Sequence, residues 1–148
     1  VLAIFSSRYL SGQSPLVFED GNQRRDFVNV RDVARACRLA LESPSANGQA
    51  FNIGSGQSHS VLEIAHELAR LLDCHQLEPE IVGRYRVGDI RHCFGDISKA
   101  KCELGYTPKV SLADGLSELA AWLVEQDQIV CDATSRADKE LMQRGLVV

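Results

Sequence analysis

The stretch from Gly21 to Ala34 limits most strongly what this chain can fold into, because it joins a turn, paired charges, a short β-branched run and the start of an amphipathic helix. Two adjacent arginines, Arg24 and Arg25, stand directly before Asp26. Neighbouring guanidinium groups suit phosphate oxygens, and adjacent carboxylates can hold them in place. The alternative is a solvated Arg/Asp cluster that caps a helix. The stretch therefore predicts either an anion-binding loop or a charged helix start.

Short extended runs alternate with amphipathic helices along the chain, which predicts an α/β fold. A Ser-x-x-Glu capping box at Ser60 and Glu63 marks one helix start, and Gly105 marks a helix end. Asp32 precedes another helix and can cap it. The expected helices cover residues 1–11, 33–42, 61–72, 97–103 and 112–123. The expected extended runs cover residues 16–18, 27–30, 50–53, 79–82 and 106–110.

The composition bounds the possible partners. The chain has 148 residues and a formal net charge of −4, which suits one domain with its own core. A general nucleic-acid binder needs a basic face, so nucleic acid is not an expected partner. Five cysteines without a Cys-x-x-Cys pair favour neither a disulfide framework nor a zinc site, and reduced thiols predict a cytoplasmic location. The apolar runs are too short for a signal peptide or membrane span, so neither is expected.

A second cationic segment lies between residues 83 and 92, where three arginines alternate with other residues that include glycine and aspartate. Charge and glycine at this density predict a loop and not the interior of a helix or strand. A diphosphate carries its charge on two groups, and two arginines from separate loops can bind both with charge-assisted hydrogen bonds. The segment is therefore the second place where an anionic ligand is expected.

The first stretch also resembles a known family. The pattern Asp-Gly-x-x-x-Arg-Asp-Phe-Val-x-Val-x-Asp-Val-Ala, from Asp20 to Ala34, is similar to a signature in the C-terminal half of extended short-chain dehydrogenases/reductases. These are the NAD-dependent nucleotide-sugar epimerases and dehydratases. In the family the arginine before Asp-Phe contacts the diphosphate of the sugar nucleotide, which implies this role for Arg25. Glu19 stands where glycine is usual and Asn29 where histidine or tyrosine is usual, and these departures leave the subfamily open.

Three further segments resemble the same family and follow in the same order. The Arg-x-Gly-Asp segment implies that Arg86 binds the diphosphate and that Asp89 meets the ribose hydroxyls. In the family the short strand that matches residues 16–18 lies along the nucleotide, which implies contacts near the base from Leu16 and Phe18. The alternative is that both are core residues, and we prefer that interpretation for Leu16.

Other residues in these segments receive plainer interpretations. Arg84 and Arg91 are expected to be solvated surface residues. Asn-Ile-Gly-Ser-Gly at residues 52–56 looks like a nucleotide loop, but it lacks the third glycine and the Gly-Lys-Ser/Thr of known loops. We interpret these glycines first as a tight strand-to-helix turn and only second as a ligand contact.

The family's chemistry requires residues that this chain lacks. It uses a Gly-rich first turn for NAD and a tyrosine with a lysine four residues later, where the lysine lowers the pKa of the tyrosine base. No Tyr-x-x-x-Lys and no Gly-x-x-Gly-x-x-Gly occurs here. The resemblance therefore assigns no catalytic or cofactor-binding residue to this chain and places NAD mainly on an N-terminal part. For an intact enzyme it implies oxidation at the sugar C4 and a 4-keto intermediate.

Together these observations predict an α/β chain that is the C-terminal portion of a Rossmann-type extended short-chain dehydrogenase/reductase, without the N-terminal dinucleotide-binding part. Residues 1–127 are the expected substrate-binding lobe, with 50–54 as the last strand of the Rossmann sheet, and 128–148 are an extra helix or tail. The expected partner is a nucleotide-diphosphate sugar, with no membrane partner, and a homodimer fits the family. A start inside a helix without Met favours a fragment. The alternatives are a stand-alone, non-catalytic binding or interaction module and a hydrolase with an unrecognised triad.

Overall fold

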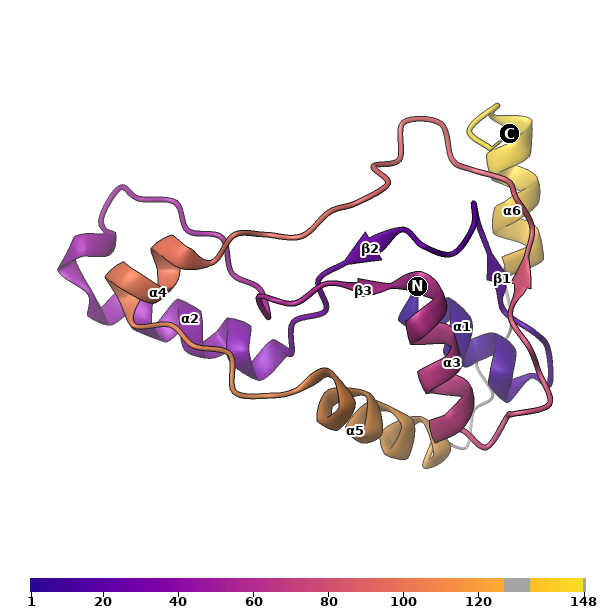
Figure 1. Ribbon diagram of the computed structural model, residues 1–148, viewed down its shortest axis with the longest axis horizontal. Coiled ribbons are helices and arrows are strands. Elements are labelled where there is room, and N and C mark those ends of the chain that lie inside the picture. Colours follow the sequence, from indigo (N-terminus) through magenta and orange to yellow (C-terminus); the bar gives the residue numbers. More distant parts are fainter. Residues whose placement is uncertain (127–133, 148) are drawn as a thin grey trace. The chain divides into compact units, whose positions relative to one another are not determined.

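The computed structural model describes residues 1–126 and 134–147 (Figure 1). Its helices are α1 (Leu2–Leu10), α2 (Val30–Glu42), the 3₁₀ turn η1 (Pro44–Ala46), α3 (Val61–Leu71), α4 (Ser98–Leu104), α5 (Leu112–Val124) and α6 (Thr134–Gln143). Its strands are β1 (Leu16–Val17), β2 (Arg24–Arg25), β3 (His59–Ser60) and β4 (Glu80–Ile81). The chain divides into a first unit, Val1–Gln23, Ser60–Arg91 and Leu116–Val148, and a second unit, Arg24–His59 and His92–Gly115.

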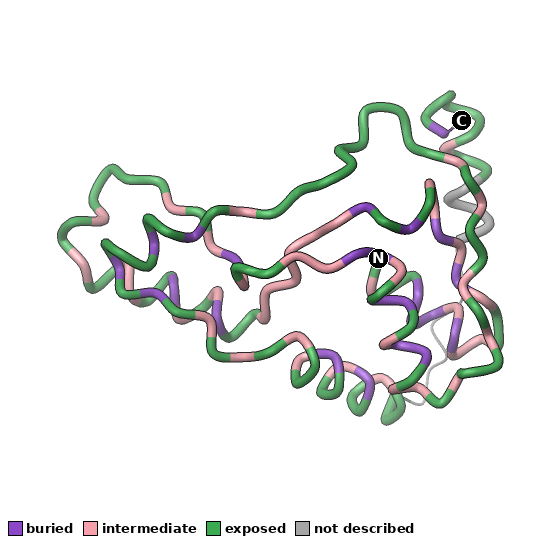
Figure 2. Tube along the Cα trace, in the orientation of Figure 1, coloured by how far each residue is buried: buried purple, intermediate pink, exposed green. Residues whose placement is uncertain are grey.

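The first unit contains a contact between α1 and α3. Tyr9 of α1 is 2% exposed, and its hydroxyl donates to the Ala65 carbonyl of α3 at 3.0 Å. Ile64 and Leu68 of α3 are completely buried, and buried positions recur along both helices (Figure 2). Burial of this kind removes apolar surface from water, which is the main stabilising term for a helix pair.

The N-terminus of α3 confirms the predicted capping box. Ser60 Oγ accepts a hydrogen bond from the Glu63 N–H at 3.1 Å, and the Glu63 carboxylate accepts one from the Ser60 N–H at 2.9 Å. The Val61 N–H donates to the Gln23 carbonyl at 3.0 Å. The free amide groups at the start of α3 are thus used both by its own cap and by the turn that precedes β2.

Gly21 occupies a position in that turn where a side chain does not fit. Its φ is 78°, a left-handed conformation that glycine adopts without strain. A Cβ there would lie 3.0 Å from Leu62 Cβ and 3.1 Å from Val17 Cγ1. The glycine of the Asp-Gly pair therefore allows β1 and α3 to approach closely.

The two short sheets differ partly from the sequence expectations. β1 and β4 are parallel, with Leu16 opposite Glu80, and β2 pairs with β3. The extended run expected at residues 27–30 is not a strand; the strand lies earlier, at β2, and α2 already begins at Val30. The reason is that Asn29 caps α2, its Oδ1 accepting the Arg31 N–H at 2.9 Å.

Asp32 does not cap α2, contrary to the expectation, but fixes a distant segment. It lies in the first turn of the helix and is 1% exposed. Its carboxylate accepts the N–H groups of Lys109 and Val110 at 3.0–3.1 Å and pairs with Arg35 at 2.6 Å. Burial acts to raise the pKa of Asp32, but the amides of Val110 and Lys109 and the Arg35 guanidinium outweigh it, so the pKa is lowered from its ordinary 3.8.

The second unit has its own small core, in which one helix face is less buried than its pattern predicts. On α2, Ala36 is 2% exposed, but Cys37 is exposed and Leu41 is 89% exposed. Gly105 ends α4 in the left-handed conformation that its sequence position predicts. The buried residues of this core are Ala36, Ile97, Ala100, Leu104 and Tyr106.

Residues 50–54 carry no strand in this structure, although the sequence predicts one. Side chains hold this segment instead: the Tyr106 hydroxyl donates to the Gly54 carbonyl at 2.8 Å, and the Ser55 N–H donates to Asp26 at 2.9 Å. A strand needs a hydrogen-bonded neighbour, and an apolar run alone does not provide one. Membership of residues 50–54 in a Rossmann sheet therefore stays a proposal.

The described residues contain no helix that is long and apolar enough to cross a membrane. The segment after the expected lobe includes α6, while residues 127–133 lie outside the described part. The division of the chain at residue 127 stays a prediction.

Candidate functional site

The Arg-x-Gly-Asp segment forms a tight turn in the first unit. The Asp89 N–H donates to the Arg86 carbonyl at 3.1 Å, and Gly88 has a φ of 80°. A type II β-turn has this bond and needs a positive φ at its third residue, which explains the glycine. Such a turn brings the Cα atoms of its end residues within about 7 Å. Arg86 and Asp89 are both exposed, so both side chains can reach a ligand.

Phe18 lies at the same turn. It directly follows β1 and is half-buried, and the Arg86 guanidinium carbon is 5.4 Å from the centre of its ring. That distance is within the range of a cation–π interaction. Leu16 of β1 is also half-buried, and its role, core or ligand contact, stays a prediction.

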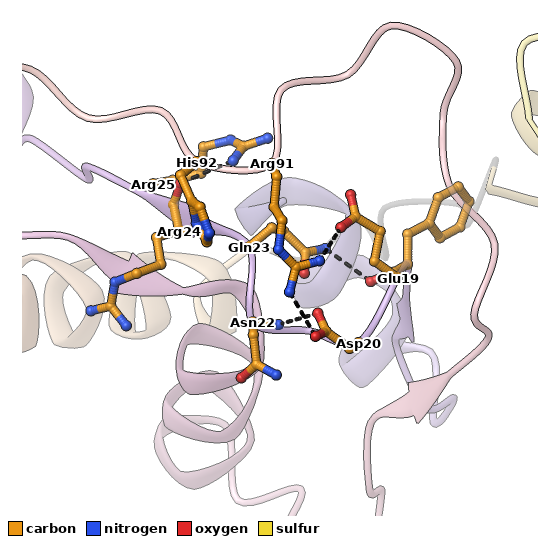
Figure 3. Close-up of polar contacts among 9 residues, drawn as sticks. Glu19, Asp20, Asn22, Gln23, Arg24, Arg25, Arg91 and His92 are labelled. Carbon is orange, nitrogen blue, oxygen red and sulfur yellow. Dashed lines mark hydrogen bonds and ion pairs between the residues drawn. The ribbon is translucent and has the colours of Figure 1, made fainter.

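Arg91 is an exposed residue, as expected, and it also forms two ion pairs that the sequence pattern does not indicate. Its guanidinium donates to Glu19 Oε2 and to Asp20 Oδ2, each at 2.7 Å (Figure 3). Hydrogen bonds from Arg91 and Asn22 hold the pKa of Asp20 well below its ordinary value. Glu19 takes a φ of 54°, the conformation that suits the glycine usual at this position. Its side chain is instead used to hold the end of the loop.

The segment after α6 pairs with the other side of the loop. The Val87 N–H donates to the Leu146 carbonyl at 2.9 Å, and Arg86 and Val147 form an antiparallel bridge. The backbone of Arg86 is thus fixed by its own turn and by a second strand-like segment.

Arg24 and Arg25 lie in β2 of the second unit. The Arg24 guanidinium donates to Ser58 Oγ at 2.9 Å and to the Ser58 carbonyl. Arg25 is half-buried and bridges to Cys93, with the Cys93 N–H donating to the Arg24 carbonyl at 3.0 Å. Both guanidinium groups have partners in the protein, since that of Arg25 donates to the Arg24 carbonyl at 2.9 Å, and ligand binding by Arg25 stays a prediction.

Asp26 supports the Gly54-Ser55-Gly56 turn. Its carboxylate accepts the Ser55 N–H at 2.9 and 3.0 Å and the Ser55 hydroxyl at 2.5 Å. A Cβ on Gly54 would overlap Asp26 Oδ2, and one on Gly56 would lie 3.0 Å from Ile97 Cδ1. The space at these glycines is filled by the protein's own side chains. Their proximity to protein atoms supports the interpretation as a tight turn.

The first unit therefore brings together three of the predicted residues, Phe18, Arg86 and Asp89. Arg25 belongs to the second unit, and its partnership with Arg86 stays a prediction. Arg84, expected to be a solvated surface residue, is half-buried, and its guanidinium carbon lies 5.3 Å from the centre of the Phe18 ring. Its alternation with Arg86 in an extended segment was the available signal, because residues i and i+2 of such a segment face the same side.

Among the described residues, no group of three or more His, Cys, Asp and Glu side chains is placed so that it could hold a metal ion. Four cysteines, Cys37, Cys74, Cys93 and Cys102, are free thiols. Cys131 lies outside the described residues.

The sequence is similar to known sugar-nucleotide enzymes. The sequence model of the NAD dependent epimerase/dehydratase family matches residues 1–54. A dTDP-L-rhamnose 4-epimerase of Burkholderia thailandensis is 36% identical over 128 residues, 85% of this chain and 34% of that protein. A UDP-glucose 4-epimerase of Mycolicibacterium smegmatis is 35% identical over 86% of this chain and 40% of that protein. A dTDP-glucose 4,6-dehydratase of Streptomyces niveus is 31% identical over 82% and 36%.

Solved structures give the same result for the fold. The UDP-glucose 4-epimerase of Thermotoga maritima with UDP-glucose superposes with a TM-score of 0.73 at 36% identity, covering 84% of this chain and 39% of that one. The UDP-N-acetylglucosamine 4-epimerase of Methanobrevibacter ruminantium, in complex with UDP-N-acetylmuramic acid, gives 0.74 at 28% identity, with 85% and 39% covered.

The chain spans about a third to two fifths of the length of these curated relatives. The matched structures are Rossmann-type extended short-chain dehydrogenases/reductases, and the match lies in their C-terminal part. The chain belongs to the NAD-dependent epimerase/dehydratase family and corresponds to a C-terminal portion of its members.

Proposed function

We propose that this chain is the nucleotide-diphosphate-sugar binding portion of an NAD-dependent epimerase or dehydratase, acting in the intact enzyme through a 4-keto sugar intermediate. Arg25 and Arg86 bind the diphosphate, Asp89 binds the ribose hydroxyls, and Phe18 and Leu16 lie near the base. Two of the similar structures contain a sugar nucleotide, UDP-glucose in one and UDP-N-acetylmuramic acid in the other. These ligands support a nucleotide-diphosphate sugar as the ligand class.

One observation carries the proposal: the type II turn that places Arg86 and Asp89 at its two ends, beside the Phe18 ring. A nucleoside diphosphate offers phosphate, ribose and base in a row. The turn and the ring offer a cation, a carboxylate and an aromatic face within one short segment of structure. Charge-assisted bonds from guanidinium to phosphate are among the stronger polar contacts that a site can make.

The proposed place of NAD depends on motifs that the family uses and this chain lacks. The turn that looks most like a nucleotide loop has its glycine spaces filled by Asp26 and Ile97, and the chain lacks both the Gly-rich first turn and the Tyr-x-x-x-Lys. A similar structure, the UDP-glucuronic acid 4-epimerase of Bacillus cereus, contains UDP-glucuronic acid and NAD. This supports the proposal that NAD in the intact enzyme is bound mainly by an N-terminal part outside this chain.

Replacing Arg86 by alanine is expected to weaken binding of UDP-glucose or dTDP-glucose by about 1–3 kcal/mol, the scale of a hydrogen bond to a charged group. The measurement is titration calorimetry of the 148-residue chain with each sugar nucleotide and with free glucose. The matched control is Arg38→Ala, because Arg38 is an exposed helical arginine that pairs with Glu42.

The expected pattern is binding of both sugar nucleotides by the unaltered chain and by the control, little binding of glucose, and weaker binding by Arg86→Ala. Equal affinity of Arg86→Ala and the control would contradict the role given to Arg86. Absence of nucleotide binding by the unaltered chain would contradict the proposed function as a whole.

A further inference from the structure

The chain leaves α6 through a motif that depends on a glycine. The Gly145 N–H donates to the Met142 carbonyl at 3.0 Å. The Leu146 N–H donates to the Leu141 carbonyl, also at 3.0 Å. These are the two hydrogen bonds of a Schellman motif, in which the residue after the helix takes the left-handed conformation. Gly145 takes it with a φ of 65°. The motif therefore ends α6 and sets the backbone direction of the residues that follow.

The segment after α6, residues 146 and 147, runs beside the cationic loop. Val147 lies opposite Arg86 in an antiparallel bridge. The hydrogen bond joins their neighbours, from the Val87 N–H to the Leu146 carbonyl at 2.9 Å. A pair with its hydrogen bonds beside it is the closely spaced kind, with Cα atoms about 4.5 Å apart and side chains on one face. Val147 is therefore the cross-strand neighbour of the Arg86 side chain.

The two members of this pair differ in exposure. Val147 is 9% exposed, whereas Arg86 is an exposed residue. A β-branched side chain has few rotamers, so a buried valine is a rigid neighbour for the aliphatic stem of an arginine. Restriction of a side chain in the free protein reduces the entropy that binding must remove. The bridge thus restricts Arg86 and leaves its guanidinium accessible.

We propose that the segment after α6 positions Arg86 for the phosphate groups of the ligand, with Val147 as the positioning residue. This inference rests on the proposed function, which gives Arg86 its ligand. It adds a role for residues that the sequence leaves as an extra helix or tail. The side chains of Leu146 and Val147 carry no charge, so they do not take the place of a phosphate at Arg86. The segment supports the binding conformation and does not block it.

The test is calorimetric titration of UDP-glucose into the 148-residue chain and into a chain that lacks residues 146–148. Removal of the segment is expected to weaken binding about three- to tenfold, the range for losing the restriction on one flexible side chain. In an Arg86→Ala background the same removal is expected to change affinity less than about twofold, because the side chain that it positions is gone. This dependence on Arg86 separates positioning from a general structural effect.

Single substitutions test Val147 itself. Val147→Ala is expected to weaken UDP-glucose binding about two- to threefold, and Val147→Ile, which keeps the branched side chain, is expected to bind as the unaltered chain does. Gly145→Ala strains the Schellman motif and is expected to weaken binding in the same direction. Its matched control is Gly48→Ala, since Gly48 has a φ of 68° and, like Gly145, space for a Cβ, but lies in the second unit.

The outcomes separate this inference from the proposed function. Unchanged affinity after removal of residues 146–148, or equal losses with Arg86 and with Arg86→Ala, overturns the positioning role while the proposed function stands. Equal losses in Val147→Ala and Val147→Ile overturn the role of Val147. If circular dichroism shows that the shortened chain is unfolded, Gly145→Ala in the two backgrounds decides in the same way. Failure of the unaltered chain to bind UDP-glucose overturns the proposed function and this inference with it.

Discussion

Replacement of Asp32 by alanine is expected to lower the free energy of unfolding by about 3–5 kcal/mol, the cost of removing one partner from a buried charged pair. Asp32 is 1% exposed and accepts the N–H groups of Lys109 and Val110 while it pairs with Arg35. Without it, two amides and a guanidinium lose their acceptor. Urea unfolding followed by circular dichroism measures the change.

The control for Asp32 is Glu42→Ala, which removes an exposed carboxylate paired with Arg38 on the same helix and is expected to cost less than about 0.5 kcal/mol. Asp32→Asn keeps the shape and part of the acceptor capacity, and it should fall between the two. A loss in Asp32→Ala no larger than in Glu42→Ala would contradict the structural account of this residue.

Asp32 also predicts a pH dependence. Its folded pKa lies below the ordinary 3.8, so the folded state binds the proton less tightly than the unfolded state. The stability that it contributes is therefore present above about pH 4 and is lost as the pH falls through the folded pKa. Unfolding curves between pH 7 and pH 3 should show that the free energy of unfolding falls less on acidification in Asp32→Ala than in the unaltered chain. An equal decrease in both proteins would contradict this prediction.

Replacement of Gly54 by alanine is expected to cost about 2–3 kcal/mol, at the upper part of the range for overpacking a tight site. The new methyl group would overlap Asp26 Oδ2 and lie 3.2 Å from Asp26 Cγ. Movement of Asp26 would break its bonds to the Ser55 N–H and hydroxyl. Thermal and urea unfolding measure the loss.

Two comparisons make the Gly54 test specific. Gly95→Ala is the matched control, because a Cβ there meets Asn52 at 3.5 Å, an ordinary contact. In an Asp26→Ala background, Gly54→Ala should cost much less, since the overlapping carboxylate is gone. The same loss in both backgrounds would show that the overlap with Asp26 is not the cause.

Local signals in the sequence predicted the helix ends well. The Ser60–Glu63 capping box and the left-handed Gly105 depend on residues within one turn of the helix, and both are present. The Arg-x-Gly-Asp segment likewise forms a turn because glycine alone fits its third position easily. Features that depend only on residues close together in the sequence could therefore be predicted from the sequence pattern.

The remaining differences come from contacts between distant residues. Arg91 bonds to Glu19 and Asp20 across 72 and 71 positions, and Asp32 bonds to Val110 across 78. Nothing next to these residues in the sequence distinguishes a solvated charge or a helix cap from such a partner. Residues 50–53 carry no strand in this structure, because a strand depends on a hydrogen-bonded neighbour that periodicity does not reveal, and their place in a Rossmann sheet stays a prediction.

The central proposal is that Arg25 and Arg86 both bind the diphosphate of the ligand. The most direct measurement is calorimetric titration of UDP-glucose into the chain with Arg25→Ala, Arg86→Ala, both changes together, and Arg38→Ala as control. We predict that each single change weakens binding by about 1–3 kcal/mol, that the double change weakens it further, and that the control binds as the unaltered chain does. Unchanged affinity in Arg25→Ala, with a normal unfolding curve, would contradict the claim.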